Sequence, residues 1–289
     1  MRSKGFVCAV LAVLVPAGAL AGCGGSSEKK QQTQQKPPAK LEVKASGAEG
    51  DLTFTVPKQA TAGPAEITFT NNAKVEADAQ LVSVQGKRED AEVVAMLGTA
   101  MKGGAVASWF KAAGGVGTLE PGENGTVTAE LKPGTYYVVG GEDEPKGPLA
   151  KFTVAMSQSG GGQSNPPTAP AKIVATDYAF SGQNVKAGQP IEFSNEGKEW
   201  HHFIGAPIKG DATIEEIKKA LESEEEEASR KLFDQEGGFE TTVMDGGIKQ
   251  IAQPDLKAGR YVFFCFVSDR GGGPPHVAKG MVSEIEVTE

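Results

Sequence analysis

Hydrophobic and polar residues follow one another in short runs along most of the chain, and turns rich in glycine and proline separate the runs. Early runs at residues 52–56, 67–70, 173–180 and 191–195 have the length and composition of β-strands. In each half, a predicted helical insert, a strand, a Pro-Gly or Ala-Gly turn, a long apolar strand and a final alternating strand follow. This order predicts an all-β protein of two tandem Greek-key β-sandwiches, each with a short helical insert.

The helical insert of the second half has the clearer signal. Thr213 and Glu216 have the spacing of a capping box, which closes the first turn of a helix. Apolar residues recur on one helical face after it, at Ile214, Ile217 and Leu221. The acidic run at residues 222–227 is read most simply as the solvated end of this helix; an acidic docking patch for a basic partner is the alternative.

The two halves of the chain resemble each other. Phe69-Thr-Asn71 matches Phe193-Ser-Asn195, and the register then holds without a gap at an offset of 124. Further on, the motif that ends in Tyr136 matches the one that ends in Tyr261, at an offset of 125. We therefore expect the halves to be repeats of one fold.

Composition divides the chain into five predicted parts. A basic start and an apolar run too short to span a membrane predict a secretory signal. Two stretches rich in Gln, Ser, Gly and Pro are too poor in apolar residues to fold. The predicted parts are a signal peptide (1–22), a tether (23–40), a first sandwich (41–155), a linker (156–170) and a second sandwich (171–289).

The end of the signal contains a candidate lipidation site. Leu20-Ala21-Gly22-Cys23 resembles the lipobox of bacterial lipoproteins. That resemblance implies cleavage before Cys23, acyl chains such as palmitate on its sulfur, and an extracytoplasmic protein anchored to the cell membrane, or to an outer membrane if there is one. An ordinary cleaved signal is the alternative.

Charge and cysteine content narrow the function further. The formal net charge of −8 argues against nucleic acid as a partner and against electrostatic adhesion to anionic lipid. Of the three cysteines, Cys8 leaves with the signal and Cys23 carries lipid, so Cys265 is left without a disulfide partner. A lone thiol in an oxidising compartment is a liability unless it is buried or bound to a metal.

Metal-binding side chains gather around that thiol in the sequence. Cys265 is followed by His276 and Met281, and the other two histidines of the chain, His201 and His202, lie in the same half. Thiolate, imidazole and thioether are the donors that hold copper in electron-transfer sites. Because side chains alternate along a strand, only one of His201 and His202 is expected to face a metal.

At these residues the second half resembles the cupredoxins, or small blue copper proteins. The spacing from Asn195 to His201 is similar to the plastocyanin-type segment that carries the first histidine ligand. The strand that ends at Cys265 and the segment from His276 to Met281 are similar to those that carry the other ligands. The resemblance implies one copper ion held by His201, Cys265, His276 and Met281. His202 is the alternative to His201, or a residue that braces the ligand loop.

The resemblance has two departures. The first predicted sandwich (41–155) contains no histidine or cysteine, and Ala77 and Gly140 stand where His201 and Cys265 stand in the second. In addition, ten residues separate Cys265 from His276, where such proteins usually have only a few. A longer loop costs little closure entropy, but its glycines are expected to hold the ligands less rigidly.

The donor set predicts an electron carrier rather than an enzyme, with an unidentified redox protein as its partner. A multicopper oxidase is disfavoured, because its trinuclear cluster needs many more histidines than the three of this chain. Two alternatives stay open. A copper chaperone or scavenger uses the same donors, and in a metal-free interaction module the cysteine and methionine would simply be core residues.

Overall fold

The computed structural model describes residues 38–141, 149–156, 168–223, 226–234 and 237–289. The predicted signal, Cys23, nearly all of the tether and most of the linker lie outside these ranges. Residues 35–289 cluster as one compact unit. Within the described ranges, no helix is both long enough and apolar enough to cross a membrane.

The chain folds almost entirely into strands. The elements of the first half are β1 (Ala39–Ser46), β2 (Thr53–Thr55), β3 (Gln59–Thr61), β4 (Gly63–Asn71), β5 (Ala77–Val84), α1 (Asp90–Met101), β6 (Phe110–Leu119), β7 (Asn124–Leu131), β8 (Gly134–Val139) and β9 (Ala150–Ala155). Those of the second half are β10 (Ala171–Thr176), β11 (Ala179–Gln183), β12 (Ile191–Asn195), β13 (Ile204–Pro207), α2 (Ile214–Glu222), α3 (Glu226–Leu232), β14 (Phe239–Glu240), β15 (Lys249–Ala252), β16 (Gly259–Phe264), η1 (His276–Lys279) and β17 (Val282–Val287).

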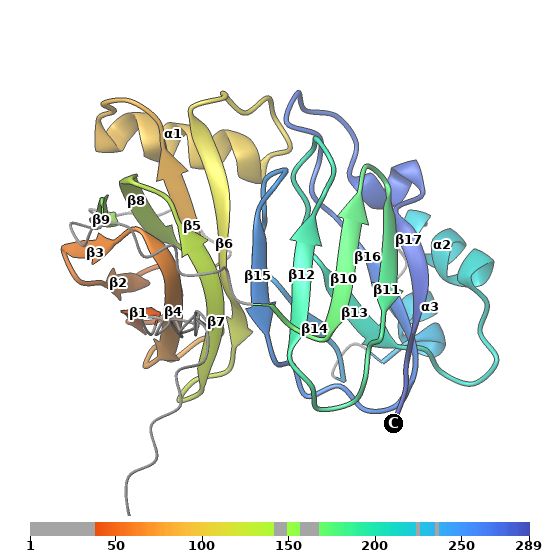
Figure 1. Ribbon diagram of the computed structural model, residues 1–289. Helices are drawn as coiled ribbons and strands as arrows, with labels where there is room; N and C mark the ends of the chain where they lie inside the picture. The colour runs from red at the N-terminus through yellow and green to blue at the C-terminus, as the bar shows by residue number, and fades with distance from the viewer. Residues whose placement is uncertain (1–37, 142–148, 157–167, 224–225, 235–236) are drawn as a thin grey trace, which may run out of the picture. The chain divides into compact units, whose positions relative to one another are not determined.

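Three sheets, two mixed and one antiparallel, build two β-sandwiches (Figure 1). One sheet, in the order β11-β10-β12-β15-β7-β4-β1-β2, contributes a layer to both halves. It faces β3-β9-β8-β5-β6 in the first sandwich (residues 39–155) and β14-β13-β16-β17 in the second (residues 171–289). The halves meet where β15 pairs antiparallel with β7, with Ile251 opposite Thr128. The predicted all-β class is therefore confirmed.

Alternation of apolar and polar residues places the core. In β1, Leu41, Val43 and Ala45 are buried, whereas the charged residues between them are exposed. Each sandwich has its own apolar cluster between its sheets, with Phe69 in the first and Phe193 in the second fully buried. Full burial of one such side chain stabilises the fold by about 1.5–3 kcal/mol.

The matched motifs of the two halves make matched hydrogen bonds. The Asn71 side chain donates to Val75 O and Leu119 O, at 2.9 and 2.8 Å. Asn195 donates in the same way to Glu199 O and Met244 O, at 2.8 and 2.7 Å. The hydroxyls of Tyr136 and Tyr261 each accept from the backbone N–H four residues earlier, at 3.1 Å.

Some element boundaries differ from the sequence-based prediction. The single strand expected at residues 173–180 is the antiparallel pair β10 and β11, because the chain reverses at Asp177-Tyr178, where Tyr178 has a φ of 69°. The Thr213–Glu216 capping box of α2 is confirmed. Of the acidic run, Glu222 ends α2 and Glu226 begins α3, whereas Glu224 and Glu225 lie outside the described residues.

Candidate metal centre

His201 is held by a loop that Asn195 shapes. The Asn195 side chain accepts from Gly197 N at 2.9 Å and donates to the carbonyl of Met244. Met244 in turn exchanges two backbone hydrogen bonds with His201, at 2.9 and 2.8 Å. The loop after β12 is therefore fixed at both ends, and the His201 side chain is fully buried.

The segment between Cys265 and His276 is long, but backbone hydrogen bonds hold its two ends together. Val277 N donates to Cys265 O at 2.8 Å, and His276 N donates to Val267 O at 2.9 Å. Ser268 and Pro275 form a bridge just beyond. Because these contacts pair the two arms, the ten intervening residues do not move the thiol away from the imidazole.

One turn of 3₁₀ helix sets the spacing from His276 to Met281. Gly280 follows η1 and caps it, and its φ of 85° is left-handed and suits glycine. Met281 N donates to His276 O at 3.0 Å. Met281 is fully buried and packs in the same apolar cluster as Cys265. Its role as an axial ligand stays a prediction.

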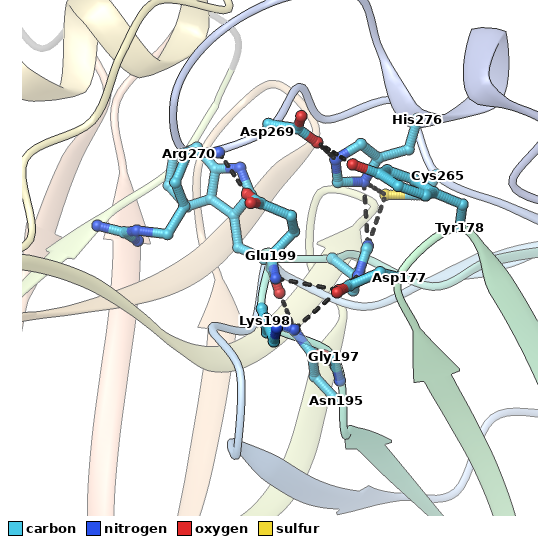
Figure 2. Close-up of polar contacts among 12 residues, drawn as sticks. Asp177, Tyr178, Asn195, Gly197, Lys198, Glu199, Cys265, Asp269, Arg270 and His276 are labelled. Atoms are coloured by element: carbon cyan, nitrogen blue, oxygen red, sulfur yellow. Dashed lines mark hydrogen bonds and ion pairs between the residues drawn. The ribbon is translucent and has the colours of Figure 1, made fainter.

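Three of the predicted donors, His201, Cys265 and His276, converge in the second sandwich. Figure 2 labels two of them, Cys265 and His276. Cys265 Sγ lies 3.5 Å from His276 Nδ1 and 3.9 Å from His201 Nδ1. The two Nδ1 atoms are 3.0 Å apart, and the three side chains are fully buried. All the donor atoms lie within 4.8 Å of one another, so a small relaxation would let one ion bind all three.

A carboxylate lies behind the ring of His276. Nε2 of His276 is 3.0 Å from Asp269 Oδ1, and this contact leaves Nδ1 free to face the thiol. Asp269 also accepts from the Tyr178 hydroxyl at 2.9 Å and from the Lys279 ammonium. Burial raises the pKa of Asp269, but these three donors outweigh it and hold that pKa below its usual value.

A second carboxylate lies behind His201. Asp177 Oδ1 is 3.7 Å from Nε2 of His201, too far for a good hydrogen bond, and Nε2 has no other partner. Asp177 is itself fixed by the backbone N–H groups of Lys198 and Glu199, at 2.8 and 3.1 Å. These bonds outweigh burial, which alone would raise the Asp177 pKa, so its pKa is lowered and it stays anionic.

Burial also sets the protonation of the donors. It raises the pKa of the Cys265 thiol to about 12. Burial, followed by the neighbouring His276, lowers the pKa of His201 to about 4, and burial likewise lowers that of His276. Two neutral imidazoles and a displaceable thiol proton then face one point, with carboxylates behind both rings. The cofactor that this donor set fits is a single copper ion.

His202, the alternative ligand, is not part of this cluster. Its Nε2 accepts from Phe266 N at 2.8 Å, directly after the cysteine. This hydrogen bond agrees with a bracing role for His202, which stays a prediction. Trp200 is buried, and its indole N–H donates to Ser268 O at 2.5 Å.

Sequence reasoning missed the two carboxylates. Asp269 lies inside the Cys–His loop, where an acidic residue among glycines was the available signal. Asp177 lies within the stretch that was predicted as one continuous strand. A prediction of the turn after β10 would have identified it as a candidate site residue.

No family model and no curated protein matches this chain. Among solved structures it is similar to reduced auracyanin from Roseiflexus castenholzii, with 19% identity over 41% of this chain and 95% of that one, and a TM-score of 0.26. Auracyanin A, a "blue" copper protein from Chloroflexus aurantiacus, has 17% identity over 40% and 96%, with a TM-score of 0.25. A multicopper oxidase has 14% identity over 86% and 88%, with a TM-score of 0.22. Likenesses this distant do not establish function, so the interpretation depends on the site's own chemistry.

Proposed function

We propose that the chain is a copper-binding cupredoxin that carries single electrons through one mononuclear copper site. The ligands are His201, Cys265 and His276, with Met281 as the weak axial donor. The observation that carries the proposal is the convergence of one thiol and two imidazole nitrogens, all fully buried, within 4.8 Å.

The protein contributes to electron transfer by holding the metal donors in positions that need not change when the copper is oxidised or reduced. Copper bound by thiolate, imidazoles and thioether exchanges one electron with little change of geometry. His201 is fixed through Met244. Cys265 O accepts from Val277 N, and His276 N donates to Val267 O, so the two ligand segments are fixed to each other. Phe266, directly after Cys265, is 44% exposed and offers an apolar contact close to the thiolate for a redox partner.

We further propose that lipid on Cys23 anchors the protein outside the cytoplasm, and that the polar tether lets it reach a redox protein in the same membrane. Support comes from the lipobox-like sequence alone, since Cys23 lies outside the described residues. The acidic net charge favours neither nucleic acid nor direct adhesion to anionic lipid.

The first sandwich is proposed to be a cupredoxin-like repeat that has no metal ligands. The matched hydrogen bonds of Asn71 and Asn195 support a common origin of the two halves. The chain is proposed to be an electron carrier and not an oxidase, because three histidines are too few for a trinuclear copper cluster beside this site.

Titration of the full chain in detergent with Cu(II) tests the proposal. Visible and paramagnetic resonance spectroscopy should detect a thiolate-to-copper charge-transfer band that saturates at one ion per chain. Cys265→Ser should abolish the band. Its absence in the wild-type protein would rule out the proposed site, and a failure to bind copper at all would favour a metal-free interaction module.

Measurements of copper release and of redox cycling on the same protein distinguish an electron carrier from a copper chaperone. Because the three donors are fully buried, we expect copper to leave slowly and the loaded protein to accept and return one electron reversibly. Rapid loss of copper to a competing chelator, with no stable charge-transfer band, would identify a chaperone or scavenger.

A further inference from the structure

The ligand loop, residues 266–275, contacts the first sandwich, which supplies none of the donors. Val106 N donates to Arg270 O at 2.7 Å, and Gly273 N donates to Gly103 O at 3.3 Å. Gly272 has a φ of +81°, and a Cβ there would lie only 3.2 Å from Gly103 O. The loop therefore approaches the end of α1 closely enough for glycine to be needed.

Arg270 is the main side chain in this contact. Its Nη1 donates to Asp245 Oδ1 at 2.7 Å, and its Nη2 donates to Ala107 O and Phe110 O, at 2.9 and 2.8 Å. The guanidinium also lies over the ring of Trp200, 5.3 Å from the centroid. Because a guanidinium presents its donors in a rigid fork, one side chain joins the loop, the second sandwich and the first.

The first sandwich also holds the segment that pairs with His201. The Gln80 side chain, on β5, donates to Val243 O at 3.1 Å and accepts from Val243 N at 2.7 Å. Asp245 N donates to Ala112 O at 2.9 Å, and Ala112 N donates to Asp245 Oδ2 at 2.7 Å. Met244, which exchanges hydrogen bonds with His201, lies between these two fixed residues.

We propose that the first sandwich is a scaffold for the copper site, and that Arg270 and Gln80 are the positioning residues through which it acts. A long glycine-containing loop closed only at its base would sample many conformations. Contacts with the first sandwich give it the rigidity that a short loop has by itself. This inference rests on the proposed copper function.

Paired arginine substitutions in the full chain test the loop contact. Arg270→Lys keeps the charge but loses the fork, so we expect copper to be released about tenfold faster, with a broader charge-transfer band. Arg260→Lys is the matched control, because Arg260 makes a bidentate pair with Glu284, at 2.8 Å for each contact, within the second sandwich. It should lower stability without changing the band or the release rate.

A second pair of variants has its substitutions in the first sandwich. Gln80→Met keeps the approximate volume but removes the hydrogen bonds to Val243, and it should also speed the release of copper. Tyr136→Phe is its control, since it removes one bond to a backbone N–H inside the first sandwich. An effect of Gln80→Met that Tyr136→Phe does not share is expected from a scaffold.

A copper-free measurement keeps this test separate from the proposed function. The rate at which a thiol reagent labels Cys265 should rise in Arg270→Lys and Gln80→Met and stay unchanged in both controls. That result supports the scaffold even if the wild-type protein forms no charge-transfer band, an outcome that would overturn only the copper proposal. Equal labelling rates in probes and controls, at temperatures where all are folded, would overturn the scaffold.

Discussion

At the scale of single residues, protonation and hydrogen bonding decide what the donors can bind. Burial keeps the Cys265 thiol protonated and the His201 imidazole neutral at pH 7, because it raises one pKa to about 12 and lowers the other to about 4. The carboxylates of Asp177 and Asp269 face the far nitrogens of the two rings. The site thus has neutral donors inside and negative charge outside.

Copper binding should therefore release about one proton per ion at pH 7, from the thiol alone. Because the Cys265 pKa is near 12, apparent affinity should fall about tenfold per pH unit on acidification toward pH 7. Below about pH 4 the fall should steepen, because His201 then takes up a proton as well. Proton release is measured with an indicator in weak buffer. Cys265→Ser should release none, and two protons from the wild type would contradict the neutral imidazoles.

The Asp269 carboxylate should stabilise bound Cu(II). Asp269→Asn removes its negative charge behind His276, so Cu(II) affinity should fall about tenfold and the reduction potential should rise. Equilibrium titration and voltammetry measure the two effects. Asp255→Asn is the control, since Asp255 forms an exposed pair with Lys257. An unchanged potential in Asp269→Asn would show that the carboxylate does not act on the metal.

At the scale of elements, turns rather than strands place the site. The turn between β10 and β11 brings Asp177 and Tyr178 to the histidines, and the loop after β12 presents His201. Gly197 lies between them, where a Cβ would be 2.3 Å from Asp177 Oδ1 and 3.2 Å from His201 Nε2. The first sandwich has Ala73 at the matching position, where there is no histidine to accommodate.

Gly197→Ala should therefore disturb both folding and the site. Overpacking of this kind costs about 1–3 kcal/mol, and the displaced Asp177 should alter the copper spectrum. Chemical denaturation and visible spectroscopy measure these effects. Gly271→Ala is a matched control in the ligand loop, because nothing lies within 4 Å of a Cβ there. Equal behaviour of the two variants would mean that Gly197 is not needed for the close approach.

At the scale of the whole molecule, one sheet contributes strands to both sandwiches. The pairing of β7 with β15 joins their backbones, and Gln80, Asp245 and Arg270 add hydrogen bonds between the halves. Two sandwiches linked in this way are expected to unfold together, although the sequence separates them with a low-complexity linker.

The two tryptophans of the chain test this cooperativity, since Trp109 lies in the first half and Trp200 in the second. Trp109→Phe and Trp200→Phe each leave one fluorescent reporter. Denaturation followed by fluorescence in each variant should match its own far-ultraviolet circular dichroism, with one midpoint. Two separated midpoints within one variant would mean that the sandwiches unfold independently.

The sequence by itself determined the all-β class, the capped helix α2 and the order of the candidate donors along the chain. Alternation, turn residues and ligand spacing are local properties of the chain, so they can be read without coordinates. It also identified His201, Cys265, His276 and Met281 as candidates before any distance was known.

Only the tertiary structure decided which of these side chains meet and what surrounds them. Backbone hydrogen bonds close the long loop where its two arms begin, and carboxylates lie behind the histidine rings. The first sandwich also makes hydrogen bonds to both ligand segments. These contacts join residues far apart in the chain. Such contacts depend on how sheets pack and turns reverse, and no local pattern encodes them. The physical reason is that donor chemistry belongs to single side chains, whereas the geometry of a metal site belongs to the packed fold.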